Sequence, residues 1–168
     1  MTPLVSIIMG STSDLPVMEK AARQLDELEI PFEILALSAH RTPDEVAEFA
    51  RGAEERGVRV IIAGAGMAAH LCGVIASMTP LPVIGVPIKA TLDGMDALLA
   101  IVQMPPGIPV ATVGINGAQN AALLAAQMLS LGDADLKKRL KAFKEGLKEK
   151  VVRANADLKE VKYNFKTN

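Results

Sequence analysis

The chain has 168 residues, of which 50% are hydrophobic and 3% aromatic, and its formal net charge at pH 7 is −1. That length fits one domain with a sizeable core, and the near-neutral charge argues against nucleic-acid or membrane partners. One cysteine excludes an intrachain disulfide and a cysteine-based metal cluster. With no signal peptide or membrane span expected, we predict a cytoplasmic protein.

Short apolar runs alternate with amphipathic segments along the chain, which predicts strands alternating with helices. The predicted strands are Leu4–Met9, Phe32–Leu37, Val58–Ala63, Pro82–Val86 and Pro109–Val113. The first predicted helix follows Asp14, and the second opens at Thr42. The other four cover about Ala68–Met78, Asp93–Val102, Ala118–Leu131 and Asp133–Ala156, and a polar tail follows the last. This order predicts one catalytic domain over residues 1–168, with 133–168 forming a C-terminal helix and tail. The fold would be a three-layer α/β/α sandwich with a parallel, flavodoxin-like or Rossmann-like sheet.

One helix start has a strong local signature. Thr42 reads as an N-cap, Pro43 occupies the first helical position, and Glu45 lies three residues after the cap. This combination is typical of a capping box. We therefore expect the Thr42 hydroxyl to cap that helix.

Basic residues are unevenly distributed. Residues 133–168 carry 11 Lys and Arg against 6 Asp and Glu, which leaves 7 against 13 in residues 1–132. We interpret the C-terminal excess as a solvated helix face. In the acidic remainder, only Arg41 and Lys89 follow the carboxyl ends of predicted strands, where ligands collect in such folds. Arg41 and Lys89 are therefore the candidate anion-binding residues.

The stretch Gly10-Ser11-Thr12-Ser13-Asp14 joins the first strand to its helix. Its glycine, hydroxyls and helix start could hold a phosphate, with Asp14 accepting from sugar hydroxyls. Taken alone, plain helix capping by the same residue types is the favoured interpretation. The stretch lacks the G-x-G-x-x-G pattern of dinucleotide-binding proteins.

The chain has two histidines, and each follows a predicted strand. His40 lies in Ser38-Ala39-His40-Arg41, where the arginine fork suits phosphate and the imidazole suits proton transfer. His70 follows Gly64-Ala65-Gly66, which reads equally well as a ligand-contacting loop or a tight turn. Cys72 suggests a thiol nucleophile with His70 as base, but a buried, inert cysteine is the favoured interpretation.

With these motifs, the sequence resembles the N5-carboxyaminoimidazole ribonucleotide mutase family of purine biosynthesis, in its bacterial-type form, over nearly all of residues 4–131. The resemblance rests on Gly10-Ser11-Thr12-Ser13-Asp14, Ser38-Ala39-His40-Arg41-Thr42-Pro43, Ala63-Gly64-Ala65-Gly66 with Ala68-Ala69-His70-Leu71, Pro82-Val83-Ile84-Gly85-Val86-Pro87, Ile101-Val102-Gln103-Met104-Pro105 and Asn120-Ala121-Ala122-Leu123-Leu124-Ala125-Ala126. Two positions depart from the family pattern: Met67 and Cys72 stand where glycine and proline are usual.

The resemblance implies a role for most of these residues. Ser11, Asp14 and Arg41 would hold the ribose phosphate of the substrate, and His40 would carry the proton chemistry. The Gly64–Leu71 loop, including His70, would line the imidazole and carboxylate end. The full expected binding set is Ser11, Ser13, Asp14, Ser38, Arg41, Gly64, Gly66, His70 and Leu71.

The implied reaction moves a carboxylate from the exocyclic nitrogen of an aminoimidazole ribonucleotide to ring carbon C4, without ATP, biotin or metal. We expect decarboxylation in a closed site followed by attack of C4 on the trapped carbon dioxide. A homo-octamer is also implied. The apolar helix Asp93–Val102 and the following Gln103–Gly107 agree, because such surfaces are normally covered.

Two rival functions remain open. One is direct carboxylation of aminoimidazole ribonucleotide, the animal-type reaction, although Arg41 and the Ala68–Leu71 run favour the mutase branch. The other is a phosphoacceptor or flavin-binding module on the same fold. A phosphoacceptor needs an aspartate where this chain has Ala63-Gly64, and a flavin module needs stacking aromatics, whereas the one tyrosine, Tyr163, lies in the tail.

Overall fold

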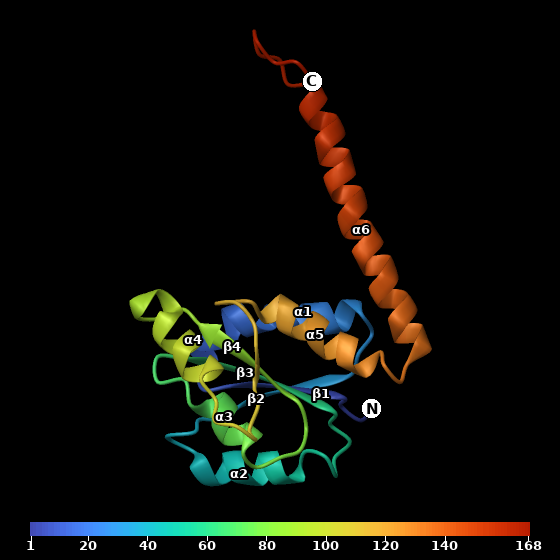
Figure 1. Ribbon diagram of the computed structural model, residues 1–168. Coiled ribbons are helices and arrows are strands. Elements are labelled where there is room, and N and C mark those ends of the chain that lie inside the picture. Colours follow the sequence, from blue (N-terminus) through green and yellow to red (C-terminus); the bar gives the residue numbers. More distant parts are fainter.

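The structure, a computed structural model, describes all 168 residues and centres on a parallel sheet (Figure 1). Its strands are β1 (Val5–Met9), β2 (Phe32–Ala36), β3 (Val60–Gly66), β4 (Val83–Ile88) and β5 (Ala111–Thr112). Their order is β2-β1-β3-β4-β5, and every neighbouring pair is parallel. This is the flavodoxin-like order, in which the direction of strand addition across the sheet reverses between β1 and β3. The predicted fold class is confirmed.

Helices cover both faces of the sheet, and alternate strand residues feed two cores. The helices are α1 (Leu15–Glu27), α2 (Pro43–Gly52), α3 (Leu71–Ala76), α4 (Met95–Val102), α5 (Ala118–Leu129) and α6 (Ala134–Lys159), with short 3-10 turns η1 (Thr12–Asp14) and η2 (Leu92–Gly94). Ile7 and Ile62 pack toward α1 and α5, whereas Ile8 and Ile61 pack toward α2, α3 and α4. Figure 1 shows these two helical layers above and below the sheet.

The third strand ends later than predicted. Residues 64–66 continue β3 and pair with β4, in the register Gly64↔Val86, Ala65↔Pro87 and Gly66↔Ile88. The expectation that these residues form a loop or tight turn is therefore wrong. Gly64 serves packing, because a Cβ at this position would overlap the buried Met18 sulfur.

Other boundaries also differ from the prediction, for reasons of pairing. Pro87 lies inside β4 and does not bound it, because the β5 ladder ends at Gly85 and requires no N–H from Pro87. The Pro87 carbonyl accepts instead from the Asn116 N–H at 2.8 Å. β2 ends at Ala36, one residue earlier than predicted, and pairs only with β1, so it is a partly exposed edge strand. β5 is shortened to residues 111–112, and α3 begins at Leu71, not near Ala68.

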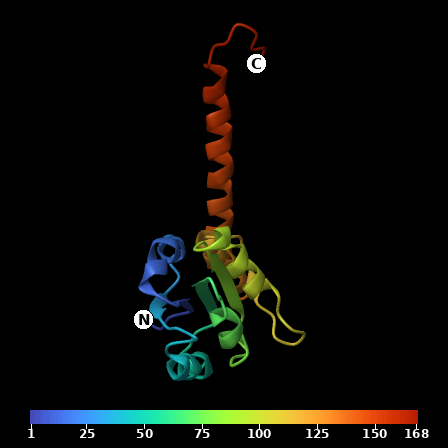
Figure 2. The ribbon, with the colours of Figure 1, turned by 90° about the vertical axis from the view of Figure 1, so that its left-hand side faces the viewer.

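The last helix starts where predicted and ends three residues later. Asp133 caps it, and its Oδ1 accepts from the backbone N–H groups of Asp135 and Leu136 at 3.0 and 2.9 Å. Only Leu136 and Leu140 are buried, and the remainder of α6 projects from the body as an arm (Figure 2). None of the helices, α6 included, combines the length and hydrophobicity that a membrane crossing requires.

Candidate active site

A cavity of about 430 Å³ opens at the carboxyl ends of β1, β2, β3 and β4. This is the switch point of the sheet, where flavodoxin-like folds bind ligands. The cavity is lined by Gly10, Ser11, Ser13, Asp14, Ser38, Ala39, His40, Arg41, Ala65, Gly66, Met67, Ala68, Leu71 and Ala90. Four strand-following segments, far apart in sequence, therefore meet at one site.

The segment after β1 presents hydroxyl and carboxylate groups to the cavity. Ser11 caps η1, its Oγ accepting from the Ser13 backbone N–H at 3.3 Å. Asp14 precedes α1, but its side chain makes no capping hydrogen bond to that helix. Burial raises the pKa of Asp14, against hydrogen bonds with Ser11 and Ser13 and the charge of Arg41, which lower it. Capping and cavity lining thus coexist in this segment.

The loop after β2 is closed by Thr42. Its Oγ1 accepts from the Ser38 backbone N–H at 2.9 Å and donates to the Ser38 carbonyl at 3.1 Å. The predicted capping box is therefore wrong: Thr42 occupies the N-cap position, but its hydroxyl makes no cap bond to α2. A hydroxyl satisfied by its own loop competes with capping, and here it holds residues 38–42 in a tight turn that carries His40 and Arg41.

Arg41 bridges the first two segments. Its Nη2 group donates to the Gly10 carbonyl at 2.8 Å, and its Nε–H donates to Ser38 Oγ at 3.3 Å. No carboxylate pairs with it. The guanidinium is therefore oriented, and its positive charge and remaining donors are free to bind an anion.

The two histidines contact each other. Nε2 of His40 and Nδ1 of His70 lie 2.8 Å apart, and the rings meet edge to face with centroids 5.0 Å apart. At this distance one nitrogen supplies a hydrogen and the other a lone pair. His40 lines the cavity, whereas His70 is exposed and is not one of the lining residues. Both were predicted site residues, but no sequence signal indicated their contact across 30 positions.

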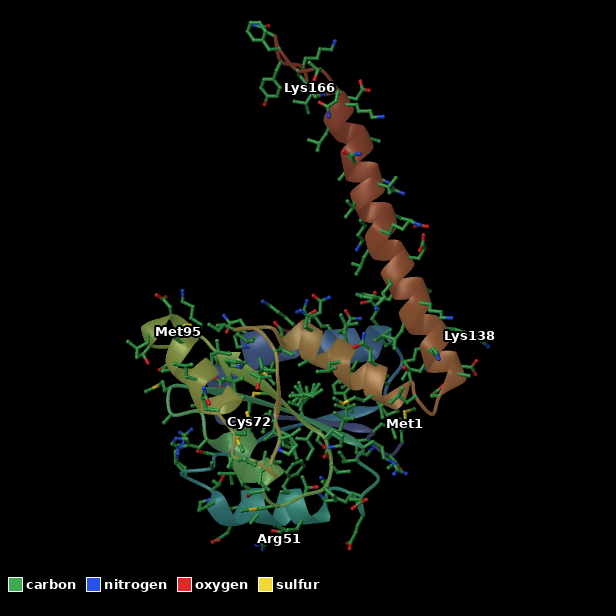
Figure 3. The ribbon with its side chains drawn as sticks, in the orientation of Figure 1. Met1, Arg51, Cys72, Met95, Lys138 and Lys166 are labelled. Carbon is green, nitrogen blue, oxygen red and sulfur yellow. The ribbon has the colours of Figure 1, made fainter.

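Cys72 takes no part in the site. It is buried between α3 and the sheet (Figure 3), its Sγ donates to the Ala63 carbonyl at 3.2 Å, and burial raises the pKa of its thiol from 9.0 to about 12. The predicted burial of Cys72 is confirmed, and because the thiolate is the reactive form, the raised pKa agrees with the expectation of an inert cysteine. Lys89, the second anion-binding candidate, forms a 2.9 Å ion pair with Asp93 and does not line the cavity.

Comparison with known proteins identifies the family. Residues 4–150 match the family described as AIR carboxylase. The chain belongs to the AIR carboxylase family. This finding confirms the resemblance inferred from the six motifs.

The named relatives and a solved structure agree with this family assignment. The N5-carboxyaminoimidazole ribonucleotide mutase of Pyrococcus abyssi is 61% identical over 147 residues, covering 87% of this chain and 84% of that protein. The mutase of Thermotoga maritima is 55% identical, covering 96% and 95%. The phosphoribosylaminoimidazole carboxylase of Candida glabrata is 52% identical over 96% of this chain, but the match spans only 28% of that protein. A crystal structure of Treponema denticola PurE superposes with a TM-score of 0.85 at 32% identity, covering 94% of this chain and 99% of that one.

In this AIR carboxylase family member, the fold gathers most of the predicted site. The cavity lining includes His40, Ser11, Ser13, Asp14, Ser38, Arg41, Gly66 and Leu71. His70 joins through His40, and Gly64 is buried beside Met18, away from the lining. Ala90 was missed, although it follows β4 as the other segments follow their strands. No three His, Cys, Asp or Glu side chains gather as a metal site.

Proposed function

We propose that this chain is an isomerase, an N5-carboxyaminoimidazole ribonucleotide mutase that forms 4-carboxy-5-aminoimidazole ribonucleotide in the de novo synthesis of IMP. The observation that carries this proposal is the meeting of an unpaired Arg41, the hydroxyl-rich segment after β1 and the His40–His70 pair in one cavity. Relatives that carry this name are 55–61% identical over most of the chain.

Substrate binding follows from the polar side of the cavity. The Arg41 fork supplies charge-assisted hydrogen bonds to the ribose phosphate, supported by the hydroxyls of Ser11, Ser13 and Ser38. The Asp14 carboxylate, unused as a cap, accepts from ribose hydroxyls. We infer that the base of the nucleotide then lies toward His40 and the segment after β3.

The chemistry then needs one proton carrier. The bond between the exocyclic nitrogen and the carboxylate carbon breaks, its electron pair stays on nitrogen, and that nitrogen gains a proton as carbon dioxide forms. The electron-rich C4 attacks the carbon dioxide, and loss of the C4 proton restores the aromatic ring. Gain and loss of one proton balance, so His40 can perform both transfers. The route needs no ATP because the carboxylate is already attached.

Direct carboxylation is the second candidate, because the Candida glabrata relative bears the carboxylase name. Turnover of synthetic N5-carboxyaminoimidazole ribonucleotide without ATP separates the two reactions when labelled bicarbonate is present. The mutase yields C4-carboxylated product with little label in the first turnovers. Fully labelled product from aminoimidazole ribonucleotide and bicarbonate would support the carboxylase, and absence of C4-carboxylated product would exclude the mutase.

Assembly and location complete the proposal. We propose a homo-octamer in the cytoplasm, the compartment that keeps thiols such as Cys72 reduced. The exposed apolar face of α4, formed by Met95, Leu99 and Val102, supports association between copies. The 103–110 loop, yellow in Figure 2, extends from the body next to this helix and widens the surface available for contact.

A further inference from the structure

Met67 adopts a backbone conformation that bulky residues avoid. Its φ is 54°, in the left-handed region, and it is not glycine. The four other non-glycine residues with positive φ are Glu29, Leu92, Asp93 and Asn116, and none of them lines the cavity. A large side chain held in this region is costly, and such residues cluster at functional sites.

Short hydrogen bonds hold this turn in place. The Met67 carbonyl accepts from the Ala69 N–H at 2.8 Å, and the Ala68 carbonyl accepts from the His70 N–H at 2.8 Å. Ala69 and Leu71 are buried directly after it. The chain therefore fixes Met67 between the end of β3 and the anchored start of α3.

The cavity has two chemically distinct sides. Hydroxyl, carboxylate and guanidinium groups come from the segments after β1 and β2. The end of β3 and the segments after β3 and β4 contribute no polar side chain; their lining residues are Ala65, Gly66, Met67, Ala68, Leu71 and Ala90. Met67 is the one long side chain of this apolar side, and it is 57% exposed. An unbranched thioether adapts its shape to what it contacts.

We propose that the Met67 side chain is the apolar cover of the aminoimidazole ring, which keeps water from the ring and carbon dioxide from leaving between the two half-reactions. The inference rests on the proposed mutase function. If carbon dioxide escapes after the nitrogen–carbon bond breaks, the nitrogen keeps its electron pair and proton, and free aminoimidazole ribonucleotide leaves as a by-product. The amount of this by-product per turnover therefore measures how often carbon dioxide escapes from the site.

Three variants separate polarity, bulk and backbone strain. Met67→Gln keeps the length of the side chain and the same φ requirement but adds a polar amide. It should release about tenfold more aminoimidazole ribonucleotide per turnover than the unmodified chain. This corresponds to a change of about 1.4 kcal/mol in the difference between the barriers to recapture and to escape of carbon dioxide. Met67→Gly should release a similar excess of aminoimidazole ribonucleotide. It should also raise Tm by about 2–4 °C, because glycine adopts positive φ freely. Met67→Leu keeps apolar bulk and should leak least of the three.

Glu29→Gly is the matched control, since Glu29 has φ 55° and lies outside the cavity. It should raise Tm comparably without changing the by-product. By-product is measured after single turnovers and corrected for decomposition without enzyme; uptake of labelled bicarbonate into product should rise in parallel. If Met67→Gln releases no more aminoimidazole ribonucleotide per turnover than the unmodified chain, Met67 does not cover the ring, although the mutase function stands. If the unmodified chain forms no C4-carboxylated product, the proposed function itself fails.

Discussion

At the scale of single residues, the hydrogen bond between His40 and His70 gives the site its most specific chemistry. His40→Asn keeps a polar side chain but removes the titratable imidazole, so turnover should fall by about 10²–10⁴-fold. Product binding, measured by calorimetry, should persist because Arg41 and Ser11 are untouched. Near-full activity would end the assignment of His40 as proton carrier.

Arg41 is the residue on which affinity should depend. Arg41→Ala removes a charge-assisted fork and the link to the Gly10 carbonyl, so the apparent affinity for the ribonucleotide should weaken by roughly 10- to 100-fold. Arg51→Ala is the matched control, because Arg51 is exposed on α2, at the lower edge of the body in Figure 3, and does not line the cavity. Unchanged affinity in Arg41→Ala would show that the phosphate binds elsewhere, and Lys89 would be the next candidate.

At the scale of elements, a buried hydroxyl and an ion pair fasten the edge strand β2. Glu33 accepts from Ser6 Oγ at 2.6 Å and from the two Arg56 Nη groups at 3.0 and 2.9 Å. Burial alone would raise the pKa of Glu33, but the hydrogen bonds and charge of its partners outweigh it and lower the pKa below the usual 4.5. Folding therefore favours the ionised carboxylate.

That preference makes stability depend on pH. The contribution of Glu33 is fully present above its unfolded value of 4.5 and is lost as the pH falls through the lower folded value. Glu33→Gln should thus reduce the free energy of unfolding by about 1 kcal/mol at pH 7, given partial exposure of the pair, and by less below pH 4.5. Urea titrations across this range test it, with exposed Glu48→Gln as control. A constant difference at every pH would contradict the prediction.

Gly64, in the second half of β3, offers a packing test. Gly64→Ala places a methyl group on the Met18 sulfur, and Met18 is fully buried. Overpacking of this kind costs about 1–3 kcal/mol of stability. Gly52→Ala is the control, since a Cβ there meets no atom within 4 Å. Equal stability of the two variants in denaturant would show that Met18 rearranges freely.

The element order was predictable from sequence because hydrophobic periodicity and turn residues agree along most of the chain. The start of the last helix is one success, since the helix predicted from Asp133 begins at Ala134. Boundaries failed where tertiary pairing overrides local signals: Gly64–Gly66 and Pro87 look like strand breakers, yet parallel partners hold them in β3 and β4. The capping prediction at Thr42 failed because its hydroxyl hydrogen-bonds to the Ser38 backbone and not to the helix N–H groups.

The site was predictable as a set of residues, since strands of a parallel sheet deliver their carboxyl ends to one edge. What sequence could not supply is the direction of side chains in the loops. The 2.8 Å contact of His40 with His70 and the left-handed φ of Met67 depend on how two turns close. Periodicity carries no information about either.

At the scale of the whole molecule, we expect assembly to cover apolar surface that one chain leaves open. Leu99 is 51% exposed at the centre of the α4 face, so Leu99→Glu should shift the octamer toward smaller species in light scattering. Leu131→Glu, at another exposed leucine, serves as a comparison. A monomeric mass for the unmodified chain at micromolar concentration would refute the octamer.

The arm formed by α6 gives the molecule a built-in gradient of amide hydrogen exchange. Its first turns are anchored through Leu136 and Leu140, while the turns beyond residue 146 are exposed and hydrogen-bond only within the helix and to Lys166 of the tail. Amides near the body should therefore exchange through rare, cooperative opening, and amides toward Lys159 through fast local fraying. Slow exchange at the far end of the helix would show that another chain covers it.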